Sequence, residues 1–175
     1  MAADARAVAD VIVIGFCLTA CVLDLRYRRI PNILTAVAAL GGVIFAAALG
    51  GLSGAGLSLA GCILGGALFF PLFALGGLGA GDVKLVAAIG AWLGPLDVMW
   101  VCLFAAMAGG VLAVVVALMR GYARNLLNNM RFIGTYWRTQ GIGPVPGLTL
   151  GETRGPRLAY ALPITVGVIV ALWWR

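Results

Sequence analysis

The sequence predicts an all-α fold: a polytopic membrane bundle of about six transmembrane helices with its N-terminus outside, on the non-cytoplasmic side of the membrane. Hydrophobic residues make up 63% of the 175 residues and charged residues only 10%, whereas a soluble domain carries roughly a quarter charged residues. Long apolar stretches alternate with short charged segments, and basic residues gather in alternate connections. These observations exclude an ordinary soluble domain and favour a helical membrane protein.

The apolar stretches give the expected positions of the helices. A membrane-spanning helix needs about 20 mostly apolar residues. The fourth stretch is short, because only 12 uncharged residues lie between Lys84 and Asp97, enough for a helix of about 18 Å. We expect it to cross only if these side chains snorkel or the bilayer thins locally, which leaves Asp82 near the polar boundary. The six stretches are Ala7–Leu23, Ile33–Leu49, Leu57–Leu78, Val83–Gly94, Val98–Met119 and Leu158–Trp174.

The basic residues set the expected orientation. With six helices and an outside N-terminus, ten of the 12 Lys and Arg residues fall on the inner side. Because basic loops stay in the cytoplasm, Asp24, Asp82 and the segment 120–157 are placed on the cytoplasmic face. We expect no cleavable signal peptide, since no basic region precedes the first apolar stretch. The ten residues are Arg26, Arg28, Arg29, Lys84, Arg120, Arg124, Arg131, Arg138, Arg154 and Arg157.

The segment 120–157 is predicted to contain an amphipathic helix from Tyr122 to Gln140. Apolar residues recur at helical spacing on one face, while Arg124, Arg131 and Arg138 recur every seven residues on another. Such a helix lies in the membrane interface, so we favour anchoring to anionic lipid headgroups over substrate recognition. Lipid contact also accounts for the net charge of +6 without a nucleic-acid partner. Residues 1–175 are treated as a single integral-membrane domain, with this segment as its cytoplasmic or interfacial loop.

Small residues and cysteines are expected to pack helices together. Cys17, Cys21 and Asp24 fall at i, i+4 and i+7, so a seam of small cysteines would turn Asp24 toward the bundle. Gly61 and Gly65 have the small-xxx-small spacing of close helix contacts. The chain has no Cys-x-x-Cys pair and no histidine. It therefore lacks the ligand pattern of a structural zinc site, and we predict no metal and no cofactor.

Asp24 and Asp82, each at the end of a long apolar stretch, are the candidate catalytic residues. A carboxylate next to hydrocarbon is costly to keep ionised, so by default it marks a functional site. Two carboxylates within about 3 Å share one proton, since both cannot ionise. The ionised member then takes a proton from water, and the protonated member donates to a peptide carbonyl. This is the chemistry of an aspartic protease.

Five neighbouring residues are expected to shape this site or bind substrate. Gly79 and Gly81 would let a backbone, such as a substrate strand, approach the acid closely. Lys84 would hold a lipid headgroup or tune the acid. Pro31 is expected at the first position of the second helix, with Asn32 as a polar group in its first turn. For Pro31 and Asn32 we favour structural roles over catalytic ones.

The residues alone leave several alternatives open. Gly-x-Gly-Asp is a short pattern that occurs by chance, and the aspartates could be solvated charges or an ion pair between Arg26 and Asp24. An ion- or proton-coupled transporter would also place acids in a membrane. However, these acids sit at one face and no inverted repeat with interrupted helices is evident. A non-enzymatic assembly subunit that docks through the basic loop is a further possibility.

The two motifs together resemble those of the type IV prepilin peptidases, membrane aspartic proteases of the Gly-x-Gly-Asp class. Asp24 is followed by basic residues and by Ile30–Thr35, Gly79–Lys84 follows later, and Arg157–Ile164 resembles the last helix of that family. The resemblance implies that Asp24 and Asp82 are the catalytic pair. It also implies a bacterial inner-membrane enzyme that cuts short basic leaders from prepilins and pseudopilins on the cytoplasmic side, typically after a glycine.

This chain differs from the larger members of that family in two respects, which indicate the form of the family that it resembles. Larger members carry a tetracysteine zinc domain near the N-terminus and methylate the new pilin N-terminus. This chain lacks those cysteines, so it resembles the short form of tight-adherence (Tad/Flp) pilus systems, and no residues are assigned to S-adenosylmethionine. Presenilin-like proteases share Gly-x-Gly-Asp, but there the partner aspartate follows a tyrosine, whereas Leu23 precedes Asp24 here. The sequence indicates no oligomeric state.

Overall fold

The computed structural model describes residues 3–121, 123–148 and 159–174, and these residues form helices without any strand. An apolar chain in a bilayer must satisfy its backbone hydrogen bonds internally, and helices do so within a single segment. The predicted all-α fold is confirmed. The helices are α1 (Ala3–Tyr27), α2 (Asn32–Ala74), α3 (Ala80–Leu93), α4 (Pro95–Met119), α5 (Ala123–Gln140) and α6 (Ala161–Trp174).

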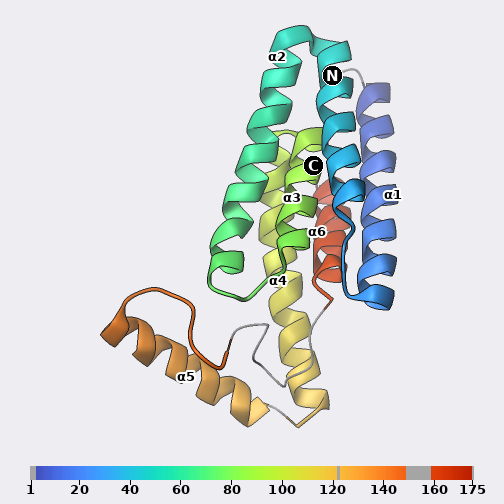
Figure 1. Ribbon diagram of the computed structural model, residues 1–175. Helices are drawn as coiled ribbons and strands as arrows, with labels where there is room; N and C mark the ends of the chain where they lie inside the picture. The colour runs from blue at the N-terminus through green and yellow to red at the C-terminus, as the bar shows by residue number, and fades with distance from the viewer. Residues whose placement is uncertain (1–2, 122, 149–158, 175) are drawn as a thin grey trace.

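Helix α2 contains two of the predicted membrane stretches. It runs for 43 residues but folds back on itself, so that its two limbs lie side by side (Figure 1). The bend is at Gly51, whose φ of 58° and ψ of −143° are readily adopted only by glycine. The connection expected between Ile33–Leu49 and Leu57–Leu78 is therefore helical as well, except at Gly51.

Within the described residues, three helices are long and apolar enough to cross a membrane: α1 from Asp4, the folded α2, and α4. Helix α6 is apolar but shorter, and Leu158, the first residue of its predicted stretch, lies outside the described residues. Large apolar side chains point outward from these helices, with Ile33 75% exposed and Leu96 75% exposed. Such an apolar exterior fits a lipid surrounding.

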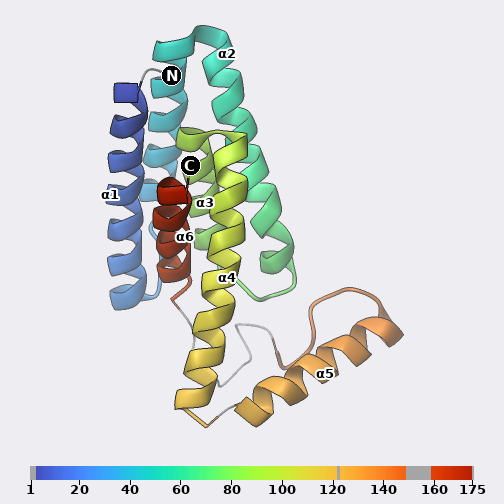
Figure 2. The same cartoon turned by 180° about the vertical axis from the view of Figure 1, so that it is seen from behind.

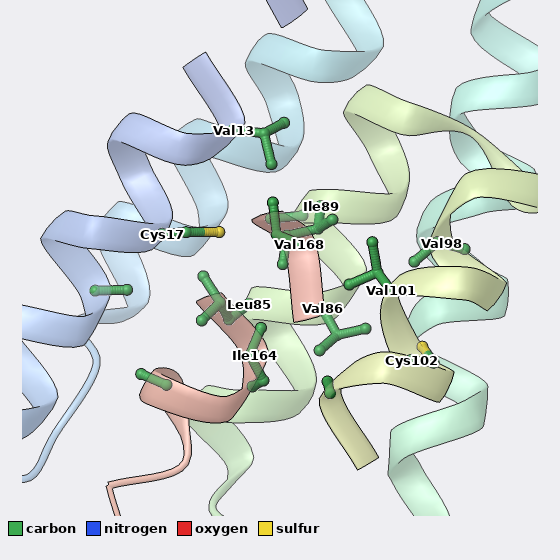
Figure 3. Close-up of a cluster of buried hydrophobic side chains, with 14 of the residues drawn as sticks. Val13, Cys17, Leu85, Val86, Ile89, Val98, Val101, Cys102, Ile164 and Val168 are labelled. Atoms are coloured by element: carbon green, nitrogen blue, oxygen red, sulfur yellow. The ribbon is translucent and has the colours of Figure 1, made fainter. Parts of the chain in front are cut away.

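Helix α3 lies at the centre of the bundle. Its residues Leu85 and Ile89 are fully buried and face Ile164 and Val168 of α6, with Val101 of α4 close by (Figure 3). Helix α1 adds Val13 and Cys17 to the same cluster. Cys17 is buried and Cys21 half-buried, which confirms the predicted cysteine seam on α1. Because α3 is enclosed by its neighbours, both its ends are fixed by packing.

The second limb of α2 packs against α3 through glycines. A Cβ atom added to Gly61 would overlap the carbonyl oxygen of Gly90, and one added to Gly65 would lie 2.8 Å from the carbonyl oxygen of Val86. The buried Ser58 hydroxyl donates to the Ala91 carbonyl at 2.6 Å. The predicted small-xxx-small contact is confirmed, and it brings two backbones into direct contact.

Helix α5 extends away from the bundle beyond the end of α4 (Figures 1 and 2). The amphipathic helix expected from Tyr122 to Gln140 is found over Ala123–Gln140, and Tyr122 lies outside the described residues. Met130 and Phe132 are exposed, and the indole of Trp137 donates to the Gly143 carbonyl at 2.9 Å. Helix α5 is therefore an arm with little support from the bundle.

Candidate functional site

The two motif aspartates lie at the same end of the bundle. Asp24 is in the last turn of α1 and Asp82 in the first turn of α3. Both helix ends, together with the start of α6, lie at the end from which α4 continues toward α5 (Figures 1 and 2). The described basic residues on the helices and connections at this end are Arg26, Arg28, Arg29, Lys84, Arg120, Arg124, Arg131 and Arg138.

Asp82 is buried and caps its own helix. Only 8% of the residue is exposed. Its Oδ2 accepts a hydrogen bond from the Gly79 N–H at 3.1 Å, and its own N–H donates to the Gly79 carbonyl at 3.1 Å. A carboxylate at this position satisfies a free N–H of the first turn and sits at the positive end of the helix dipole. Helix α3 therefore begins at Ala80, three residues before the predicted Val83.

Asp24 is half-buried and is held by a distant part of the chain. Its Oδ2 accepts a hydrogen bond from the backbone N–H of Ala161, the first residue of α6, at 3.3 Å. The proposed ion pair with Arg26 is not found among the described residues; the Arg26 guanidinium lies 5.8 Å from the centroid of the Tyr27 ring. The carboxylate of Asp24 therefore faces the bundle, as the cysteine seam predicts.

The fold brings together the helices that carry the two aspartates. Helices α1 and α3 are in contact, and Asp24 and Asp82 lie at the ends of these helices that share one end of the bundle. Two carboxylates that lie close together disfavour double ionisation and favour a shared proton, which is the property that an acid–base pair requires.

The glycines of the second motif make room for this chain's own residues. A Cβ on Gly81 would lie 3.1 Å from the Cβ of Ile30, and a Cβ on Gly79 would lie 3.2 Å from Oδ2 of Asp82. In this structure Ile30 occupies the space beside Gly81, and the approach of a substrate strand to Gly81 stays a prediction. The packing of Ile30 against Gly81 joins the segment after Asp24 to the segment that holds Asp82.

Pro31, Asn32 and Lys84 lie beside the pair. Pro31, expected at the first helical position, is instead the residue before α2, with an extended ψ of 133°. The prediction was wrong by one position because a proline ring fixes only φ. The φ of −61° at Pro31 suits both the first helical position and the residue before the helix. The Lys84 ammonium donates to Oδ1 of Asn32 at 2.9 Å. Both residues line an open groove of about 330 Å³ between α2 and α3, with Thr35, Ala36, Ala39 and Ala87.

A family model described as the type IV leader peptidase family matches residues 11–114, a span that includes both aspartates. The chain belongs to the type IV leader peptidase family. This confirms the resemblance on which the two motifs were assigned. No solved structure matches the chain.

One curated relative of this leader peptidase family member is the type 4 prepilin-like proteins leader peptide-processing enzyme of Escherichia coli O78:H11 (strain H10407 / ETEC). It is 32% identical over 116 residues, which cover 62% of this chain and 43% of the relative. The chain thus spans less than half of that relative.

The sequence reasoning missed the part of the site that α6 supplies. Ala161 and Tyr160 lie outside the matched span 11–114, and neither was given a role. The sequence did contain a signal for this contact, namely the start of the last apolar helix. The free N–H groups at a helix N-terminus attract carboxylates. Within the described residues, no group of three or more His, Cys, Asp or Glu side chains gathers as a metal site would require.

Proposed function

We propose that this chain is a membrane aspartic endopeptidase that removes the short basic leader from type IV, Flp-like prepilins at the cytoplasmic face. The observation that carries the proposal is the placement of Asp24 and Asp82 on two helices that are in contact, at one end of an otherwise apolar bundle. Membership of the type IV leader peptidase family and the prepilin-processing relative support the same reaction.

The proposed reaction uses the two aspartates as one acid–base pair. The ionised carboxylate takes a proton from water while the protonated carboxyl donates its proton to the scissile carbonyl oxygen. The tetrahedral intermediate then collapses: the C–N bond breaks, the leaving nitrogen gains a proton, and the pair returns to one shared proton. Hydrogen bonds from Gly79 and Ala161 hold the two carboxylates in fixed orientations, which keeps the pair aligned for attack.

The location of the pair at one end of the bundle suits a prepilin substrate. A prepilin carries a charged leader followed by an apolar helix, so the helix would dock from the lipid and leave the leader junction at the interface. The concentration of basic residues at the same end supports a cytoplasmic orientation in the inner membrane. The net charge of +6 is then met by anionic lipid headgroups.

Prepilin cleavage in membranes tests the proposal. We expect the parent chain, co-expressed with an Flp-type prepilin, to convert the precursor to a shorter form. Asp24→Asn and Asp82→Asn should each abolish conversion, a loss of at least about a thousandfold for removal of an essential acid or base. Asparagine keeps the size and a hydrogen-bonding oxygen but cannot exchange the proton.

Asp4→Asn is the matched control. Asp4 is exposed near the opposite end of α1, so this variant should cleave like the parent. Cleavage by both Asp24→Asn and Asp82→Asn at equal protein level would assign the aspartates to structure and end the protease proposal.

A further inference from the structure

The first turn of α6 leaves one backbone N–H for Asp24. The first N–H groups of a helix have no partner within it, so each needs a partner outside. Leu162 and Ile164 donate to carbonyls of the two residues before the helix at 3.2 Å each, and Pro163 has no N–H. The N–H that remains is that of Ala161, and it donates to Oδ2 of Asp24 at 3.3 Å. The carboxylate of α1 thus completes the first turn of α6.

Thr165, one turn further along α6, holds the same residue from its other side. Its hydroxyl donates to the carbonyl of Ala161 at 2.7 Å and lies 3.3 Å from the carbonyl oxygen of Cys17 on α1, to which it also donates. Thr165 is only 5% exposed, and a buried hydroxyl depends on protein partners. One hydroxyl therefore joins α6 to the helix that carries Asp24.

Helices α1 and α6 are in contact at two heights. They run antiparallel, with the end of α1 beside the start of α6 (Figures 1 and 2). The contacts at Asp24 and at Thr165 lie one above the other along this pair, so together they resist sliding of α6 against α1. On another side of α6, a Cβ added to Gly167 would lie 2.5 Å from the backbone nitrogen of Ala105 on α4. Helix α6 is therefore held between α4 and α1.

We propose that Thr165 is a positioning residue of the aspartate pair: its hydroxyl holds the first turn of α6 against α1, and that turn holds the carboxylate of Asp24 through the N–H of Ala161. The inference rests on the proposed protease function and extends it to a helix outside the family-matched span 11–114. Thr165 takes no part in the proton transfers. It acts on the orientation of Asp24, and misplacement of a catalytic group by about 1 Å can cost about a hundredfold in rate.

Two substitutions of Thr165 separate its hydroxyl from its methyl group. Valine keeps the shape and loses the donor, whereas serine keeps the donor and loses the methyl group. Hydrogen bonds between membrane helices are modest, so we expect Thr165→Val to lower kcat for prepilin cleavage about five- to tenfold, with KM little changed. Thr165→Ser should stay within about twofold of the parent because the bond is kept. An equal loss in both variants would assign the effect to packing and overturn the proposal.

Thr19→Val is the matched control. Thr19 is an exposed residue of α1 whose hydroxyl donates to the Gly15 carbonyl at 2.8 Å, the same bond to the residue four positions earlier that Thr165 makes. Among the described residues, the hydroxyl of Thr19 bonds only within its own helix. This variant should cleave like the parent. A fall in kcat as large as that of Thr165→Val would show that the bond within a helix, and not the contact between helices, sets the effect.

Amide hydrogen exchange at Ala161, followed by NMR in detergent, measures the positioning without catalysis. The N–H of Ala161 should exchange several-fold faster in Thr165→Val than in the parent, because its acceptor is no longer held in place and the turn opens more often. Thr165→Ser and Thr19→Val should exchange like the parent. Unchanged exchange at Ala161 in Thr165→Val would overturn the proposal even if kcat falls.

These outcomes are distinguishable from failure of the proposed function. If the parent cleaves and Asp24→Asn and Asp82→Asn do not, the aspartic protease stands whatever Thr165→Val does. Parent-like kcat in Thr165→Val would then reject only the role of Thr165. Protein level and thermal unfolding in detergent, measured for each variant, exclude loss of fold as the cause.

Discussion

The α2–α3 pair and the α5 arm show two ways in which this chain uses helices. Between α2 and α3, glycines bring the backbones into contact at Val86 and Gly90, and this contact holds the helix whose first turn contains Asp82. Helix α5 leaves the bundle, and Met130 and Phe132 on it are exposed. The first region holds a site by packing, whereas the second offers a surface. Substitutions of the same kind should therefore have very different effects in the two regions.

The largest effect is expected at the glycine contact. Gly61→Ala places a methyl group on the Gly90 carbonyl, and the two backbones must separate. Overpacking of this kind costs about 2–3 kcal/mol. Thermal unfolding in detergent should show the loss, and cleavage should fall with it because α3 moves.

Two glycine controls sharpen this prediction. Gly56→Ala on α2 and Gly134→Ala on α5 add a methyl group with nothing within 4 Å, so both should be neutral or slightly stabilising. An equal loss of stability at all three positions would mean that helix propensity, and not backbone contact, sets the effect.

An intermediate effect is expected for α5, on lipid binding rather than stability. Arg131→Gln with Arg138→Gln removes two charges, each worth about 1 kcal/mol of attraction to an anionic surface. Hydrogen exchange of the full-length protein in nanodiscs should show α5 protected more strongly with anionic than with neutral lipid, and the double variant should lose most of this difference.

Arg6→Gln, at the opposite end of α1, is the control and should keep the difference in protection. If the parent chain shows equal protection of α5 in both lipids, the arm does not bind anionic headgroups.

The smallest effect is expected at the exposed edge of the α2–α3 pair. The hydrogen bond between Lys84 and Asn32 is solvent-exposed, so a double-mutant cycle with Lys84→Ala and Asn32→Ala should give a coupling of about 0.5 kcal/mol. Cleavage by each single variant should stay within about threefold of the parent, equivalent to roughly 0.6 kcal/mol. A loss comparable to that of Asp82→Asn would move Lys84 into the catalytic machinery.

Much of the fold follows from the sequence because its signals are local. Apolar length predicts the membrane helices, and the spacing of Gly61 and Gly65 predicts a helix contact. The bend at Gly51 could not be predicted, because nothing distinguishes that glycine from its neighbours in a glycine-rich stretch. Its positive φ depends on how the two limbs of α2 pack.

The candidate site likewise has features that the sequence predicts and features that only the folded chain shows. Both aspartates are recognisable from their motifs. The orientation of Asp24 toward the bundle is predictable too, because Cys17 and Cys21 lie on the same face of the helix. The N–H of Ala161 and the contact of Ile30 with Gly81 are not recognisable, because each joins residues that only the folded chain brings together. A pattern read along the chain carries no information on such contacts.

The capping bond of Asp82 has a consequence for what a single substitution would do to this chain. The oxygen that accepts from Gly79 is also present in asparagine, so Asp82→Asn keeps the start of α3. On the proposed mechanism, loss of cleavage is thereby separated from loss of fold at this residue. The variant would still fold and bind a precursor without cutting it, and would act as a sequestering pseudoenzyme.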